Sequence, residues 1–271
     1  MFYIIPWSLT AILYIPILVE LYTLRWPMIG YSHAYFIIPI SFYLIWKKRE
    51  LLIPIAAARF RLTCFSLTLL SFGLLLYLYG FRQGFCSIAI FSLIPVSLGM
   101  VLYFYGKKAA FNLLFPILLF LLIIPVPVQL LNLVSMPLRT GITLSGDFIL
   151  TLFDFIVHHQ GFHIFFKSYD VYIGARSSGL PLFMDFFCLG LVYTYLLPLS
   201  LKSKIKLVLS IIPLTLIANL AAVSIYCLIL AFFGPRMITS LLHALIIFLI
   251  YVTMVYAFIK YEKNLNENDF N

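Results

Sequence analysis

The sequence predicts an all-α polytopic membrane protein, and three observations support this fold class. Of the 271 residues, 64% are hydrophobic and only 10% are charged, whereas a soluble domain has close to half apolar and about a quarter charged residues. Apolar runs of about 20 residues, the length that a transmembrane helix needs, recur along almost the whole chain. The charged residues fall mainly between these runs. The composition therefore excludes an ordinary soluble domain, a disordered chain, a nucleic-acid-binding protein and a secreted disulfide scaffold.

Charges and clusters of Gly or Pro divide the chain into about eight predicted transmembrane helices. The second is short, and the first lacks a basic segment before it and a small-residue cleavage site after it, so we expect it to be retained rather than removed as a signal peptide. The predicted spans cover residues 2–24, 33–46, 62–81, 85–105, 109–131, 179–200, 207–233 and 237–259.

The distribution of Lys and Arg predicts the orientation of these spans. With the N-terminus in the cytoplasm, twelve of the 18 basic residues face the cytoplasm and six face outward, as the positive-inside rule requires. We therefore expect a multi-pass protein of the cytoplasmic (inner) membrane with both termini cytoplasmic. The net charge of +9 is then mainly a topology signal, although basic inner loops also attract anionic lipid headgroups. Oligomeric state cannot be derived from these features.

One long segment, residues 132–178, separates the fifth and sixth spans and is predicted to lie outside the membrane. Residues 134–157 have apolar residues at mixed spacings of three and four, which indicates an amphipathic helix in the outer interface. Residues 161–174 alternate apolar and polar side chains around a turn at 167–170, which indicates a short hairpin. We expect one transmembrane domain over residues 1–259, with 132–178 as an insert and 260–271 as a disordered cytoplasmic tail.

Few residue types suited to chemistry occur at predicted membrane depth, where ionisable groups are costly. They include His33, Asp185 and His243, and each also has a simpler interpretation as a hydrogen-bonding group between helices. His243 lies about 9 Å from the outer end of its helix at the helical rise. No cofactor or metal is predicted, because the four cysteines are scattered through apolar runs and the three histidines of the insert lack further ligands at metal spacing.

A polar cluster, Arg176, Ser177 and Ser178, stands where the insert enters the sixth span. A hydroxyl beside a histidine and a cation supplies the groups for a nucleophile, a base and an oxyanion stabiliser. Asp185 follows Ser178 by seven residues, so the two share a helix face.

Several blocks of the sequence match a known family in order and approximate spacing. They are Tyr31-Ser32-His33 with the basic 44–49 segment, Phe115-Pro116 with Ile124-Pro125-Val126-Pro127, Ser177-Ser178-Gly179-Leu180, Ala218-Asn219-Leu220-Ala221-Ala222, and His243. The chain from Tyr31 to about Ile259 thus resembles the exosortase/archaeosortase family of membrane cysteine transpeptidases and proteases. The resemblance implies eight helices and an outward-facing catalytic site.

This chain departs from the family pattern at two catalytic positions. Ser177 stands where the family has a cysteine, and Ala222 stands where it has an arginine, so only His243 remains of the three catalytic residues. A serine hydroxyl is a poorer nucleophile than a thiolate and needs a general base. Either the two residues were introduced to inactivate the enzyme or the chain is a divergent member, and we favour divergence. Whether the chain is an active enzyme is left open.

The resemblance implies an exported protein as partner, carrying a C-terminal recognition motif, a hydrophobic helix and a basic tail, which the chain recognises and cleaves or transfers. Ser177 would hold the nucleophile position and His243 would be the acid and base, while Ala222 marks the missing cation. Arg176, Ser178, Asn219, Asp185 and His33 are possible supporting residues. The alternative is a non-enzymatic binder in envelope or exopolysaccharide assembly. A transporter is disfavoured, because it would need more charged groups at mid-depth.

Overall fold

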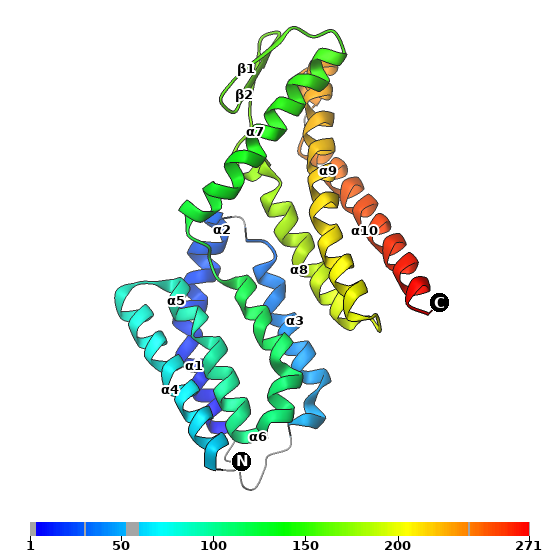
Figure 1. Ribbon diagram of the computed structural model, residues 1–271. Coiled ribbons are helices and arrows are strands. Elements are labelled where there is room, and N and C mark those ends of the chain that lie inside the picture. Colours follow the sequence, from blue (N-terminus) through cyan, green and yellow to red (C-terminus); the bar gives the residue numbers. More distant parts are fainter. Residues whose placement is uncertain (1–3, 30, 53–59, 238, 271) are drawn as a thin grey trace. The chain divides into compact units, whose positions relative to one another are not determined.

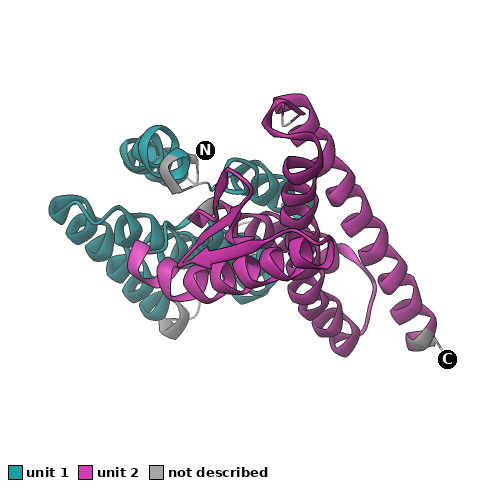
Figure 2. Ribbon diagram, turned by 90° about the horizontal axis from the view of Figure 1, so that it is seen from above, with its two compact units in different colours: residues 1–126 teal, residues 127–271 magenta. Residues whose placement is uncertain are grey.

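The computed structural model describes residues 4–29, 31–52, 60–237 and 239–270 (Figure 1). The chain forms two compact units, residues 1–126 and 127–271 (Figure 2), where the sequence analysis expects one domain. Each unit is described by itself below.

The described chain contains five helical stretches that are long and apolar enough to cross a membrane, so it is an all-α membrane protein apart from one small sheet. Two shorter apolar helices accompany them, and eight spans remains a prediction. The five stretches are Ile5–Arg25, Thr63–Gln83, Cys86–Ile123, Leu201–Phe233 and Ser240–Glu267, and the shorter helices are Ala34–Lys47 and Leu180–Leu196.

The first unit is built from helices that follow one another with short connections. In order they are α1 (Ile4–Glu20), η1 (Leu21–Arg25, a π-helical turn), α2 (Trp26–Ile29), α3 (Ala34–Lys47), η2 (Arg49–Leu51), α4 (Phe60–Gln83), α5 (Cys86–Phe91), α6 (Leu93–Leu118) and η3 (Leu119–Ile123). Gly106 breaks α6, with φ 77° and ψ −175°, and the chain turns back there (Figure 1). The break falls between the predicted fourth and fifth spans.

Glycines allow the helices of the first unit to approach one another closely. A Cβ on Gly80 of α4 would lie 2.5 Å from the backbone nitrogen of Ala89 in α5, and one on Gly99 of α6 would lie 2.9 Å from the backbone nitrogen of Leu70 in α4. Small residues of this kind are typical of helix contacts in membranes, where close backbone packing replaces the hydrophobic effect.

The second unit contains α7 (Val128–Leu152), a three-stranded sheet and three further long helices. The strands are β1 (Val157–Gln160), β2 (His163–Phe166) and β3 (Tyr169–Tyr172), followed by η4 (Ala175–Ser178), α8 (Leu180–Leu196), α9 (Leu201–Phe233), η5 (Pro235–Met237) and α10 (Ser240–Phe270). The sheet is antiparallel in the order β1-β2-β3.

The predicted hairpin corresponds to β2 and β3, whose turn contains Lys167 at φ 52°, and the sequence analysis missed β1. Buried Ile164 and Phe166 of the sheet pack with Leu150 of α7 and Ala231 of α9. The predicted amphipathic helix is α7, which begins six residues earlier and ends at Leu152, and its place in the outer interface remains a prediction.

The expected disordered tail is helical, because α10 continues to Phe270. The carboxylate of Asp269 accepts hydrogen bonds from the Ser200 backbone N–H at 2.9 Å and from the hydroxyls of Ser200 and Ser203. The Ser200 backbone donor, followed by the Ser203 hydroxyl, holds the pKa of Asp269 below its ordinary value. Because these serines begin α9 and Leu265 of α10 is buried, the polar end of α10 is tied to α9.

Candidate active site

Two sequence blocks that are far apart in the chain meet at Ser177. The Asn219 side chain of α9 donates from Nδ2 to the Ser177 carbonyl oxygen at 3.2 Å. Gly179 has φ 79°, and a Cβ there would lie 2.8 Å from both Cγ and Nδ2 of Asn219. Ser177 itself is partly buried in η4, where its N–H donates to the Gly174 carbonyl at 3.0 Å. The backbone around the serine is therefore fixed to the middle of α9.

The Ser178 side chain is held by hydrogen bonds to the neighbouring backbone. It is completely buried, donates to the Ala175 carbonyl at 2.7 Å and accepts from the Leu180 N–H at 3.3 Å. It thus bonds within η4 and also accepts from Leu180, the first residue of α8, whose N-cap is Gly179. The two adjacent serines therefore differ, because the Ser178 hydroxyl is bonded to the backbone and buried, whereas Ser177 is only partly buried. Arg176 contributes its backbone to η4, and its side chain lies outside the described part of the structure.

Ala222, which the sequence resemblance places at an arginine position, is buried. Ala222 has 5% of its surface exposed and lies three residues after Asn219 on α9. It supplies no charge to the site. An arginine introduced there would have to displace the groups that bury the alanine.

A different arginine, Arg139 of α7, is buried beside the segment that leads to Ser177. Its Nε donates to the Ile173 carbonyl at 2.7 Å and its Nη2 to the Tyr172 hydroxyl at 2.9 Å, while its guanidinium carbon lies 3.6 Å from the centre of the Phe162 ring. Within the described residues no carboxylate forms an ion pair with it. Arg139 is therefore bonded to the backbone of Ile173, which precedes Ser177 by four residues, and it has no carboxylate partner in the described part of the chain.

His243 lies in the first turn of α10 and binds a tyrosine of α9. Its Nδ1 and the Tyr226 hydroxyl form a hydrogen bond, and the same hydroxyl donates to the His243 carbonyl at 3.3 Å. The rings lie 5.1 Å apart. Tyr226 follows Asn219 by seven residues, about 10 Å along α9. No hydrogen bond joins Ser177 to His243 within the described chain, so α9 is the element that both residues contact.

The other predicted site residues, Asp185 and His33, lie outside the elements that contain Ser177 and His243. Asp185 lies partly buried on α8. His33 belongs to the first unit, where its Nε2 hydrogen-bonds with the Leu122 carbonyl at 3.1 Å and its ring lies 5.0 Å from that of Tyr31.

The histidines of the sheet form pairs with carboxylates. His159 bonds with Asp147 at 2.7 Å, and His163 bonds with Asp170 at 2.8 Å. No group of three or more His, Cys, Asp or Glu side chains that could hold a metal ion occurs among the residues that the structure describes.

Sequence reasoning missed two residues that the structure places at this site. Tyr226 follows Asn219 and Ala222 at helical spacings of seven and four, which is a signal available in the sequence. Arg139 is surrounded in the sequence by residues of an amphipathic helix, and its burial depends on the aromatic residues of the sheet, so no local pattern identifies it.

The fold and these contacts define a polytopic membrane protein in which a short three-stranded sheet leads into a serine held by a neighbouring helix. Residues 26–259 match the family of transmembrane exosortases, and the chain belongs to this family. No curated protein and no solved structure matches the chain.

Proposed function

We propose that the chain processes C-terminal sorting signals of exported proteins, by cleavage or transpeptidation, at the outer face of the cytoplasmic membrane. The contact between Asn219 and Ser177 is the observation that carries this proposal, because it joins the family block with the nucleophile position to the block on α9. Family membership supports the substrate class. The substrate's hydrophobic helix would enter from the bilayer and place its scissile bond at Ser177.

The proposed reaction uses Ser177 as nucleophile and His243 as acid and base. The Ser177 Oγ forms a bond to the scissile carbonyl carbon while His243 takes the hydroxyl proton. The tetrahedral intermediate then breaks its C–N bond, and His243 returns the proton to the leaving amine. An acceptor amine or water attacks the resulting ester and releases Ser177. Catalytic hydrogen bonds often shorten only in the complex with substrate. Ser177 and His243 both contact α9 through its side chains, and they would approach each other when substrate binds.

In this proposal Tyr226 and Arg139 are positioning residues. The Tyr226 hydroxyl orients the His243 ring through Nδ1, which leaves Nε2 for proton transfer. Arg139 donates to the carbonyl of Ile173 and would hold the segment that leads to Ser177 in place.

The proposal is tested by reconstituting the full chain with candidate C-terminally anchored envelope proteins and measuring the mass of the processed substrate. The chain as it stands is compared with Ser177→Ala, with Ser177→Cys, and with Ser177→Cys combined with Ala222→Arg. We expect processing by the unmodified chain and none by Ser177→Ala, and Ser177→Cys should be faster because a thiolate is the stronger nucleophile.

Two other outcomes of this assay would point to different functions. Activity only in the doubly changed protein would mean that the scaffold is intact but lacks its chemistry. Substrate binding without processing in all four proteins would favour the non-enzymatic binder.

A further inference from the structure

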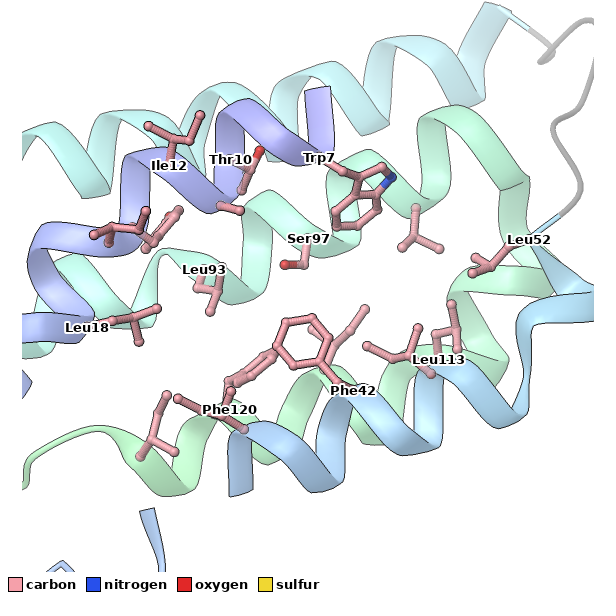
Figure 3. Close-up of a pocket in the computed structure, with 18 of the residues that line it drawn as sticks. Trp7, Thr10, Ile12, Leu18, Phe42, Leu52, Leu93, Ser97, Leu113 and Phe120 are labelled. Carbon is pink, nitrogen blue, oxygen red and sulfur yellow. The ribbon is translucent and has the colours of Figure 1, made fainter. Parts of the chain in front are cut away.

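The first unit encloses an elongated apolar cavity of about 560 Å³ between α1, α3 and both limbs of α6 (Figure 3), within the size range of about 300–1,000 Å³ that is usual for ligand sites. It extends from Trp7, Leu52 and Leu113 at one end to Leu18 at the other. We call it the α1–α3–α6 cavity.

Four lining residues carry hydroxyl groups, Thr10, Tyr14, Ser97 and Tyr105, and two of these hydroxyls are bonded within the protein. Thr10 donates to the Pro6 carbonyl at 2.9 Å, and the Tyr14 hydroxyl hydrogen-bonds with Ser92 at 2.6 Å. Ordered water needs two to four polar partners, so the lining favours an apolar occupant.

The length of the cavity matches one leaflet of a membrane. From Trp7 to Leu18, α1 rises by about 16 Å, which is close to half of the roughly 30 Å hydrocarbon thickness of a bilayer. An occupant that fills the cavity along its length therefore has the dimensions of one acyl chain.

Among the described residues, basic side chains outnumber acidic ones near one end of the cavity. Lys47, Lys48 and Arg49 stand between the lining residues Ile45 and Leu52, and Lys107 and Lys108 follow the lining residue Tyr105. Lys48 connects the two groups, because its Nζ donates to the carbonyl oxygen of Asn112 at 2.6 Å. Glu50 is the acidic residue within this basic cluster.

The opposite end of the cavity carries no such excess of charge. Beyond Leu18, Arg25 forms an ion pair with Glu20 at 2.9 Å. His33, also near this end, bonds to the Leu122 carbonyl. The cavity thus has an apolar interior, one basic end and one balanced end.

We propose that the α1–α3–α6 cavity holds one acyl chain of an anionic phospholipid whose phosphate group lies against Lys107, Lys108 and the 47–49 cluster. Charge complementarity selects this occupant. A hydrophobic helix followed by a basic tail would bring like charge to the same end, and a zwitterionic lipid would gain less from it. The proposal is independent of the processing reaction.

The test measures lipid binding to the purified full chain in detergent by native mass spectrometry. Phosphatidylglycerol and phosphatidylcholine with identical acyl chains are titrated separately. We expect phosphatidylglycerol to bind about 10- to 30-fold more tightly, since two lysines near a lipid surface contribute about that factor.

Two variants separate the headgroup from the acyl chain. Lys107→Gln with Lys108→Gln should remove the preference for phosphatidylglycerol, whereas the control Lys202→Gln with Lys263→Gln, which removes two exposed lysines of the second unit, should retain it. Ala11→Phe adds volume at an exposed lining position and should weaken binding of both lipids.

Quenching of Trp7 fluorescence tests the position of the acyl chain without altering the cavity. Phosphatidylglycerol brominated along its acyl chain should quench Trp7 fluorescence at stoichiometric lipid, and Trp7→Phe should remove that component. Equal affinity for the two lipids, unchanged binding in Ala11→Phe, absence of Trp7 quenching, or displacement of the lipid by a basic-tailed hydrophobic peptide would each overturn the proposal.

Discussion

The helices within the first unit and the helices within the second unit make different characteristic contacts. In the first unit, helices approach at glycines such as Gly80 and Gly99, and the charges gather at the ends of the cavity. In the second unit, side-chain hydrogen bonds connect the elements, including Asn219 to Ser177, Arg139 to Ile173 and Ser200 to Asp269. Side-chain hydrogen bonds also join helices of the first unit, as between Tyr14 and Ser92. The difference is that close glycine contacts with a backbone distinguish the first unit, whereas the polar contacts of the second unit include the predicted site residue Ser177.

The largest expected effect is on the stability of the first unit. Gly80→Val would force a side chain against the Ala89 backbone, which cannot swing away, so we expect a loss of about 3 kcal/mol, the upper end of typical overpacking costs. Thermal unfolding in detergent measures it. Gly141→Ala in α7 is the matched control, because its Cβ meets nothing within 4 Å and it should be neutral or slightly stabilising. Equal losses would mean that close approach is not what holds the first unit.

In the second unit, Gly179→Ala should damage the site more than the fold. The new Cβ would press on Asn219 at 2.8 Å and disturb its bond to Ser177. A displacement of about 1 Å near a reacting group costs about 100-fold in rate, measured as processing in the reconstituted assay. Gly161→Ala has the same left-handed backbone, φ 60°, with no atom within 4 Å. It should process normally, and a similar loss in both variants would assign the effect to backbone strain.

Arg139→Gln tests whether the buried guanidinium group holds the segment between Ile173 and Ser177 in place. The change removes the donor to the Ile173 carbonyl, and an unsatisfied buried acceptor costs about 1–3 kcal/mol, seen as a lower melting temperature together with slower processing. Arg139→Lys keeps the charge but not the two-point contact. Its melting temperature and processing rate should lie between those of the unmodified chain and those of Arg139→Gln. Full activity in Arg139→Gln would remove this residue from the account.

Tyr226→Phe should reduce processing with little effect on stability. It removes the hydroxyl that binds His243 but keeps the ring contact, so kcat should fall about 10-fold, part of the usual contribution of general acid–base catalysis, and its pH dependence should shift. Tyr193→Phe removes the hydroxyl of a tyrosine on α8 whose ring lies 6.0 Å from that of Phe258, and it serves as the control. An unchanged pH profile in Tyr226→Phe would show that the tyrosine does not position the histidine.

The smallest effect concerns pH and the end of α10. The hydrogen bonds to Asp269 lower its pKa from the ordinary value of 3.8, so its contribution to stability is complete above that value and disappears as the pH falls through the lowered pKa. Asp269→Asn should therefore melt slightly earlier than the unmodified chain at pH 7, and the difference should vanish in strong acid. A difference that grows on acidification would contradict this sign.

The comparison of the units also explains what the sequence could predict. Apolar runs and breaks identify the membrane-embedded helices, and Gly106 lies within the predicted boundary of the fourth and fifth spans. The Ser177 and Asn219 blocks were identified by family resemblance, but their hydrogen bond depends on how α9 packs beside η4.

Polar residues at a chain end resemble disorder in a sequence, and only the Ser200 and Ser203 contacts with Asp269 reveal a helix there. The burial of Arg139 likewise depends on Phe162 and Tyr172 of the sheet segment. Such contacts join residues distant in sequence, so no local pattern carries them.

The most direct test of the central claim is to trap the covalent intermediate. The reconstituted chain is quenched during turnover of a processed substrate, digested, and mapped by mass spectrometry. The account predicts an acyl group in ester linkage on Ser177 that hydroxylamine removes and that Ser177→Ala lacks. An acyl group on another residue, or processing that continues in Ser177→Ala, would contradict it.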